Sequence, residues 1–439
     1  MKLEKYSIGV GDRFGLEGVA QLRALQAAGE RGVQIVPVWN KSNREHTLIG
    51  TSPGDARKAA VTAVKKCRWT NSYYVDADHI GLGNVDPFLA ACNYFTIDIA
   101  DFIGKPADPV LRKKFIDGQR RFVGELSIPG IERTFQVSVE SLGSFADKYL
   151  CAITEAGHVY RYIAGKKGGD GYIIEVSVDE ASQPQTPIDL FFILAAIAAE
   201  GIPVQTIAPK FSGSFLKGID YVGDLGQFTR EFEDDIAVLG FAVRSFNLSA
   251  NLKLSVHSGS DKFSLYPIIR RAIMKSDTGI HLKTAGTTWL EEVIGLAAAG
   301  KDGLQLAQEI YAASFMRFDE LAKPYLPVIA IDKSKLPHPK EVDQWDSNKF
   351  VDTLRHDQSN PLYNIHFRQL LHIGFKIAAE MGDRFIVLLN KYRDEIEANV
   401  TYNIFDRHIL PLFIGEGTED RNPVILTDAK RTVPRVVNS

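Results

Sequence analysis

Short apolar runs alternate with amphipathic helical patterns along the first two thirds of the chain. Apolar runs of about four to eight residues predict buried strands, and apolar positions three and four residues apart predict helices. The strand candidates are Ser7–Gly11, Val33–Trp39, Tyr73–Asp78, Tyr94–Ala100, Tyr172–Asp179, Val204–Lys210, Lys253–Gly259 and Gly279–Ala285. Helical patterns follow most of them, at Gly15–Ala28, Asp55–Cys67, Pro187–Glu200, Leu225–Leu239 and Thr287–Ala299.

Strands that alternate with helices predict an α/β protein with a parallel sheet. Eight strands in this order are typical of a (β/α)8 TIM-like barrel, which we place at residues 1–300. An open, doubly wound sheet uses the same local alternation and remains the alternative, although the count of eight favours the barrel. Residues 101–170 interrupt the pattern with charged, irregular sequence, so we expect a long insertion there.

The remainder of the chain reads as helical. Periodic stretches at Gln305–Ala322, Asn364–Met381 and Arg384–Ala398 predict a helical extension, residues 301–414, packed on the barrel. Residues 415–439 lack this periodicity, so we expect a flexible tail.

Composition narrows the class of partner. With 45% hydrophobic and 24% charged residues, the chain lies in the globular range, which excludes disorder and fibrous structure. Lys and Arg total 51 against 54 for Asp and Glu, a net charge of −3 without long blocks of one sign. No global field is therefore available to recruit nucleic acid or a membrane. A small-molecule substrate is expected, and the composition is compatible with a homo-oligomer.

Cysteine usage and hydropathy favour a cytoplasmic protein. Cys67, Cys92 and Cys151 have no C-x-x-C spacing, which suits a reducing compartment and no zinc ribbon. The most apolar run, Leu190–Ala199, has ten residues, whereas a membrane span needs about 20. The first residues lack the apolar core of a signal peptide.

Charged residues recur at the carboxyl ends of the predicted strands, where barrel enzymes place their active sites. Because alternate strand residues share a face, Glu175 and Asp179 lie opposite a row of Ile and Val. For the same reason, Asp76 and Asp78 share one face of their strand. His281 and Lys283 share one face of theirs.

Buried acids and imidazoles cost several kcal/mol unless they are paired or bound to a metal. Imidazole and carboxylate suit Zn²⁺, Mn²⁺, Ni²⁺ or Co²⁺, with His79, His257 and His281 as nitrogen donors. No local metal motif is present, so this site depends on the barrel. Taken singly, each histidine could be structural, and Asp78 or Asp179 could cap a turn. Glu175 lies between Ile and Val in mid-strand, where capping is no explanation, and is the best catalytic candidate.

Glycines and lysines near the strand ends suggest ligand contacts. The segment Gly9-Val-Gly-Asp-Arg-Phe-Gly15 is one residue too long for a dinucleotide fingerprint, so its glycines would turn the chain and present Asp12 and Arg13 to a ligand. Ammonium groups near other strand ends could bind a carboxylate, hydroxyl or enolate oxygen. These are Lys210, Lys217, Lys262 and Lys283, with a solvated role as the alternative, above all for Lys217.

The chain resembles the tagaturonate epimerase family, metal-dependent enzymes that interconvert tagaturonate and fructuronate and include members acting on tagatose and fructose. The matching motifs are Gly9–Gly15, Val75–His79, Phe95–Asp98, Glu175–Glu180, Lys217–Tyr221, Val256–Ser264, His281–Thr287 and, more weakly, Arg368–His372.

The resemblance implies residue roles. Asp78 resembles the family's proton acceptor, Glu175 its proton donor, and His79 and His257 its metal ligands. We add His281, because its parity and strand end agree, and Asp220, as an oxygen donor that would complete the metal shell. Substrate contacts are expected from Asp12, Arg13, Asp179, Lys210, Lys262 and Lys283.

The expected reaction is a metal-dependent epimerisation of a ketohexuronate or ketohexose. The inverted carbinol lies β to the ketone, so enolisation cannot exchange its hydrogen, and we expect retro-aldol cleavage followed by reclosure. A metal-dependent ketose isomerase, an aldolase and a non-catalytic sugar-binding barrel are the alternatives.

Overall fold

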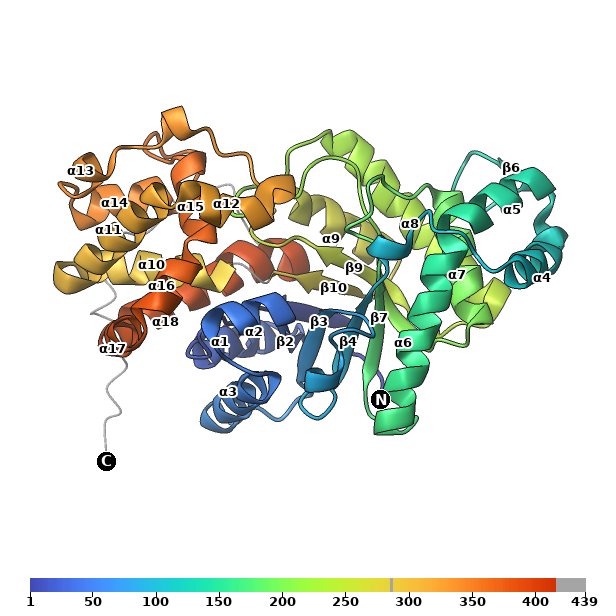
Figure 1. Cartoon of the computed structure of the whole chain (residues 1–439), viewed down its shortest axis with the longest axis horizontal. Helices are drawn as coiled ribbons and strands as arrows, with labels where there is room; N and C mark the ends of the chain where they lie inside the picture. Colours follow the sequence, from blue (N-terminus) through green and yellow to red (C-terminus); the bar gives the residue numbers. More distant parts are fainter. Residues whose placement is uncertain (285–286, 416–439) are drawn as a thin grey trace.

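The computed structural model describes residues 1–284 and 287–415. A central barrel lies between two helical regions, the insertion at one end of the molecule and the carboxyl-terminal helices at the other (Figure 1). The end of the strand candidate at Ala285 and the tail at 416–439 lie outside the described residues. Within the described ranges, no helix combines the length and apolar character that crossing a bilayer requires.

Eight parallel strands form a closed barrel, which confirms the predicted fold over the open sheet. The first strand pairs with the last, with Tyr6 opposite Ile280, and this pairing closes the cylinder. The strands are β1 (Tyr6–Val10), β2 (Val36–Ser42), β3 (Tyr74–Ile80), β4 (Tyr94–Asp98), β7 (Ile173–Ser177), β8 (Val204–Ala208), β9 (Lys253–His257) and β10 (Ile280–Lys283).

Helices surround the barrel. They are α1 (Gly18–Glu30), α2 (Asn43–Ile49), α3 (Pro53–Lys66), α6 (Cys151–Lys167), α7 (Pro187–Ala199), α8 (Leu225–Phe246), α9 (Tyr266–Lys275) and α10 (Thr287–Ala299). Helix α7 carries eight consecutive buried residues, Leu190–Ile197, as expected of a helix that is covered on all sides.

Residues 101–170 form an insertion between β4 and β7, as expected, and this insertion is mainly helical, which its sequence did not indicate. It holds α4 (Pro109–Gln119), α5 (Val139–Phe145) and the small hairpin of β5 (Gly124–Leu126) and β6 (Phe135–Val137) before α6 begins. Helix α6 buries a face rich in alanine and glycine, including Ala152, Ala156 and Gly157. Small residues carry little of the hydrophobic periodicity that identifies a helix in sequence, which explains the difference.

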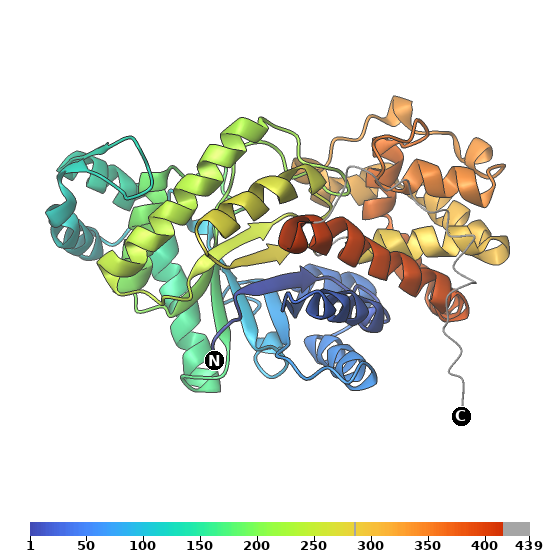
Figure 2. The ribbon, with the colours of Figure 1, turned by 180° about the vertical axis from the view of Figure 1, so that it is seen from behind.

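The carboxyl-terminal region is helical, as predicted. Its longer helices are α11 (Lys301–Met316), α14 (Ser347–Leu354), α15 (Ile365–Ile373), α16 (Phe375–Met381), α17 (Asp383–Lys391) and α18 (Arg393–Tyr402), and short helices α12 (Phe318–Ala322) and α13 (Pro339–Val342) lie between them. A π-helical segment, Asn403–Ile414, continues α18. Both run back along the barrel and pack on α1, where Thr401 donates a hydrogen bond to the carbonyl of Ala20 (Figure 2).

Alternate strand residues point into the barrel, and the inner side chains change character along its axis. At the amino-terminal end they form a separate apolar cluster of Leu3, Val36, Val38, Tyr74, Tyr94 and Ile173. Two residues further along β3 and β7, the inner positions are Asp76 and Glu175, both buried. The polar half of the interior therefore opens at the carboxyl ends of the strands.

Candidate active site

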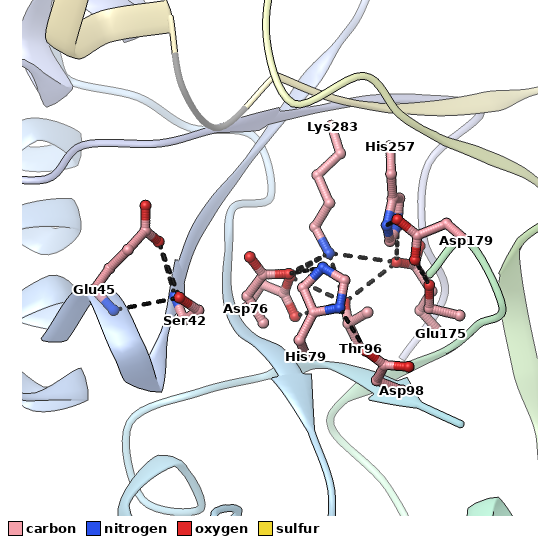
Figure 3. A network of polar contacts seen from close by, with 12 residues as sticks. Ser42, Glu45, Asp76, His79, Thr96, Asp98, Glu175, Asp179, His257 and Lys283 are labelled. Carbon is pink, nitrogen blue, oxygen red and sulfur yellow. Dashed lines mark hydrogen bonds and ion pairs between the residues drawn. The ribbon is translucent and has the colours of Figure 1, made fainter. Parts of the chain in front are cut away.

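Lys283 on β10 lies at the centre of the polar half, among three carboxylates (Figure 3). Its Nζ lies 2.7 Å from Oδ1 of Asp78, 3.0 Å from Oδ2 of Asp76 and 3.4 Å from Oε1 of Glu175. It also donates a hydrogen bond of 2.8 Å to Oγ1 of Thr96. All five side chains are buried, so these contacts operate with little screening by solvent.

The charges of this cluster follow from burial and from Lys283. Burial raises the pKa of Asp76 to about 7, against the opposing effect of Lys283. Burial acts the same way on Glu175 and Asp78, but Lys283 outweighs it, with His257 at Glu175 and His79 at Asp78, and both pKa values fall below their usual range. The three carboxylates hold the pKa of Lys283 well above its usual value despite burial. Glu175 and Asp78 are therefore ionised at neutral pH.

Glu175 is held by partners from β4 and β9, in addition to Lys283 on β10. It accepts hydrogen bonds of 2.8 Å from the Tyr94 hydroxyl and 3.2 Å from Thr96, and its Oε1 lies 2.8 Å from Nε2 of His257. A carboxylate fixed by several donors keeps one orientation, as acid–base chemistry requires. The sequence placed this residue inside the barrel, and the structure agrees.

Two histidines lie at the mouth of the barrel, His79 near the end of β3 and His257 at the end of β9, where it pairs in register with Lys283. Nδ1 of His257 is 3.1 Å from Oδ2 of Asp179, Nδ1 of His79 is 2.9 Å from Oδ2 of Asp98, and the two rings are 5.6 Å apart. Burial lowers the pKa of each ring, but the carboxylates more than offset it. Asp78 and Asp98 raise the pKa of His79 to about 10, and Asp179 and Glu175 raise that of His257 to about 9.

His79 reaches the mouth because β3 is irregular there. The pairing of β3 with β4 shifts register between Ala77 and Ile80, and His79 adopts the left-handed conformation with φ of 53°. Consecutive residues of a regular strand point to opposite faces. The bulge instead brings Nε2 of His79 to 3.6 Å from Oδ1 of Asp78, so neighbouring residues share one site. Backbone strain of this kind often occurs at functional sites.

The mouth residues fit a divalent cation. One donor atom from each of His79, Asp179 and His257 lies within 4.8 Å of the other two. His79, Asp98 and Glu180 form a second such group. Two imidazoles and one carboxylate suit a transition metal, and carboxylates behind the ligating histidines are the usual outer partners.

His281 and Asp220, predicted as metal ligands, lie elsewhere, and no metal-compatible group among the described residues includes them. His281 lies one layer below Lys283, where its Nδ1 is 2.9 Å from the Ser7 hydroxyl and burial lowers its pKa to about 3. Asp220 accepts hydrogen bonds from the backbone and hydroxyl of Ser264, which tie two loops together.

Only some of the predicted substrate contacts lie in the site. Asp179 and Lys283 lie in the site, whereas Asp12 accepts backbone hydrogen bonds of 2.7 Å from Gly15 and 2.9 Å from Glu17. Two lysines hold loops. Lys262 donates to the carbonyls of Ile219 (2.7 Å) and Leu216 (3.0 Å), and Nζ of Lys210 is 3.5 Å from the carbonyl of Asp179. Arg13 lies at the mouth, buried beside Glu45.

Sequence reasoning assigned no role to Asp76, Thr96, Asp98 or Asn40. The first three follow from parity, because each shares its strand face with a predicted residue or directly supports one. Asn40 was missed because the predicted strand ended at Trp39, whereas β2 continues to Ser42. It is buried, its strand parity matches that of Val38 inside the barrel, and neither amide atom has a hydrogen-bond partner among the described residues. An unpaired buried amide can bind a ligand hydroxyl.

A closed (β/α)8 barrel with acids and histidines grouped at the carboxyl ends of its strands has the usual arrangement of a barrel enzyme's active site. The sequence profile of the tagaturonate epimerase family, UxaE, matches residues 1–412. The tagaturonate/fructuronate epimerase of Thermotoga maritima is 30% identical over 386 residues, which are 84% of this chain and 72% of that protein. The chain therefore belongs to the tagaturonate epimerase family, and it is an epimerase, an isomerase-class enzyme.

Solved structures agree with this fold. The crystal structure of the fructuronate-tagaturonate epimerase UxaE from Cohnella laeviribosi with one glycerol has a TM-score of 0.78 and 24% sequence identity to this chain. The match covers 94% of this chain and 82% of that one. The native crystal structure of the same protein has a TM-score of 0.77 over the same shares of the two chains, again at 24% identity.

Proposed function

We propose that this enzyme interconverts tagaturonate and fructuronate by inverting the carbinol β to the ketone, with a divalent metal ion. The Thermotoga relative carries this activity in its name, and the acids and histidines at the mouth supply the groups that the reaction needs. The observation that carries the proposal is the meeting of Glu175, Lys283 and His257 from three strands in one buried cluster.

The metal ion would be held by His79, His257 and Asp179, with Asp98 and Glu175 behind the two rings. When bound, a divalent cation supplies Lewis-acid polarisation of a ketone and a neighbouring hydroxyl oxygen. His281 and Asp220 would take no part, since His281 lies in the layer below and Asp220 ties two loops.

The chain's own acids would move the protons. Asp78 is ionised and lies at the mouth, so it can accept the proton of the carbinol hydroxyl. The bond between that carbon and its neighbour nearer the ketone then breaks, and its electron pair moves to the ketone, which gives a three-carbon enediolate and a three-carbon aldehyde. After the aldehyde rotates, the bond forms again on its other face, and the new alkoxide takes the proton back.

Glu175 would serve the opposite side of the substrate. Its contacts with the Tyr94 hydroxyl and with His257 connect it to two groups that can pass a proton. Lys283 is charged and lies between Glu175 and Asp78, so it would stabilise the negative charge that develops on oxygen between the two acids.

One assay tests the proposal. The protein, loaded in turn with Zn²⁺, Mn²⁺, Ni²⁺ and Co²⁺, is incubated with tagaturonate, fructuronate, tagatose and fructose, and the products are resolved by chromatography. We expect each uronate to give the other, without solvent deuterium at the carbon next to the ketone. Deuterium at that carbon would indicate an isomerase, two smaller products an aldolase, and sugar binding without turnover a binding module.

A further inference from the structure

A second group of charges lies at the barrel mouth, where the carboxyl-terminal extension meets the strand ends. Arg13 follows β1 and is 7% exposed. Its Nε is 3.2 Å from Oε1 of Glu45, but its Nη1 is buried without a hydrogen-bond partner among the described residues. A buried guanidinium N–H without a hydrogen-bond partner lowers the stability of the fold. A bound ligand that accepts a hydrogen bond from Nη1 would remove this penalty.

Lys217, in the loop after β8, supplies a second cation. A Cβ atom placed on Gly259 would lie 3.6 Å from Nζ of Lys217, and Gly259 follows His257 by two residues. Both backbone polar groups of Lys217 are bound to the extension, the N–H to the carbonyl of Val328 at 2.8 Å and the carbonyl to Gln369 at 2.9 Å. The backbone of Lys217 is thus held by the extension, and its ammonium lies near Gly259, two residues after the predicted metal ligand His257.

One of these two cations, Arg13, is paired with a carboxylate. Glu45 binds Arg13 through Oε1, and its Oε2 accepts hydrogen bonds from the backbone and hydroxyl of Ser42. Burial would raise the pKa of Glu45, but Arg13 and then Ser42 outweigh it, with a smaller effect of Lys217, and the pKa falls. Glu45 therefore balances Arg13. The charge of Lys217, whose pKa is lowered by burial, has no ion-pair partner within the described part of the chain.

The extension covers this pair of cations. The ring of Phe375 lies 4.2 Å from the guanidinium carbon of Arg13. His372 is buried and packs over Gly218, next to Lys217, with its Nδ1 3.6 Å from the position of a Cβ on that glycine. Burial, then Arg13 and Lys217, hold the pKa of His372 well below its usual range, so the ring is neutral and can share a hydrogen bond with an anion without adding charge.

We infer that Arg13 and Lys217 form a carboxylate-binding subsite, closed by Phe375 and His372 of the extension, that selects sugar acids over neutral ketoses. The inference rests on the proposed function and adds to it the residues that recognise the carboxylate of the substrate. Arg13 would bind one carboxylate oxygen through its free Nη1, and Lys217 would neutralise the charge. Lys262 and Lys283 cannot bind this carboxylate. The ammonium of Lys262 donates to backbone carbonyls, and that of Lys283 is paired with three acids.

Arg13→Gln and Lys217→Met test the subsite in the full-length, metal-loaded enzyme. Loss of a charged hydrogen bond to the carboxylate should raise KM for tagaturonate by about 10- to 100-fold. The ratio of kcat/KM for tagaturonate to that for tagatose should fall by a similar factor. Arg44→Gln is the matched control, because Arg44 also lies over an aromatic ring of the extension, that of Tyr325 at 4.9 Å, but is exposed. It should leave the ratio unchanged.

Binding gives an independent measurement. Calorimetry with galactonate, a sugar acid without a ketone, should show binding to the parent protein and to Arg44→Gln, and binding at least tenfold weaker to Arg13→Gln. Circular dichroism and a melting curve establish that each variant is folded, and Arg13→Lys, which keeps the charge, should recover part of the loss.

Failure of the subsite and failure of the proposed function give different results. A parent enzyme that turns over none of the four sugars would contradict the proposed function, while galactonate binding would still decide the subsite. If the parent interconverts the uronates but Arg13→Gln and Lys217→Met keep its KM and ratio, the subsite is wrong and the epimerase stands. Competition by tagatose 6-phosphate that exceeds that of galactonate and is lost in Arg13→Gln would assign the subsite to phosphate and overturn the carboxylate.

Discussion

The two ends of the barrel interior are built from the same strands and differ in chemistry. On β7, Ile173 and Glu175 are both fully buried, two residues apart on one face. Ile173 belongs to the apolar cluster at the amino-terminal end, and Glu175 contacts Lys283 and His257. Tyr94 joins the two, because its ring packs in the apolar cluster and its hydroxyl binds Glu175. The apolar cluster thus packs the strands together, and the same strands position the polar side chains of the site.

Glu175→Gln should give the largest effect and should act on activity. Gln keeps the volume and can still bind the Tyr94 hydroxyl but removes the charge facing Lys283 and His257, so kcat should fall by about 10³-fold. Steady-state kinetics on the uronates measures this, with the exposed Glu132→Gln as control. Full activity in Glu175→Gln would exclude this carboxylate from the chemistry.

Metal content separates the predicted ligands at the mouth from those that lie outside it. His79→Ala and His257→Ala should lose the ion, because each removes one donor of a three-residue group. Asp220→Asn should retain it, since Asp220 binds Ser264. Elemental analysis after dialysis against each metal checks this. An ion retained by His257→Ala and lost from Asp220→Asn would reverse the assignment.

Ile173→Ala should cost stability and spare the chemistry. Removing a fully buried aliphatic side chain typically lowers the free energy of unfolding by about 2–5 kcal/mol. Urea denaturation measures the loss, and kcat per folded molecule should stay within about threefold, because the polar cluster lies above this layer. A large loss of kcat in folded Ile173→Ala would show that the two ends are not separable.

Lys253, at the amino-terminal end, should affect stability in a way that depends on pH. Burial lowers its pKa to about 8, and it donates to the carbonyl of Leu3 at 3.3 Å. Between pH 8 and the unfolded pKa near 10.4, the unfolded chain binds more protons, so stability should rise with pH, by roughly 3 kcal/mol in all. Urea denaturation across pH 7.5–10.5 should show this rise in the parent and lose it in Lys253→Met. Parallel profiles would contradict the burial of a charged ammonium.

Sequence periodicity predicted the barrel well, because eight apolar runs and their parity are local features. Parity also placed Glu175, Asp78 and Lys283 inside the cylinder. It could not predict the bulge that turns His79 to the mouth, since this bulge is a property of pairing between β3 and β4. Nor could it separate His281 from His257. The alternation along a strand predicts which face of the sheet a side chain lies on, but it does not predict how far along the barrel axis that side chain lies.

Loops and the extension were the hardest to predict. The role of Lys217 depends on the approach of residues more than a hundred positions further along, Val328 and Gln369, and no local pattern announces such a contact. The same holds for Arg13 beneath Phe375. Lys262 and Asp220 look like ligand contacts in the sequence, yet both hold loops together in the fold.

The return of α18 to α1 sets an order of events during synthesis. Helix α1 is made among the first 30 residues, but its outer partners, α18 and the π-helical segment, end at residue 414. A nascent chain would leave this side of α1 uncovered until residue 414 has left the ribosome, and domains of this size generally fold as units. Helix α1 can therefore reach its final packing only after the carboxyl-terminal extension has been made.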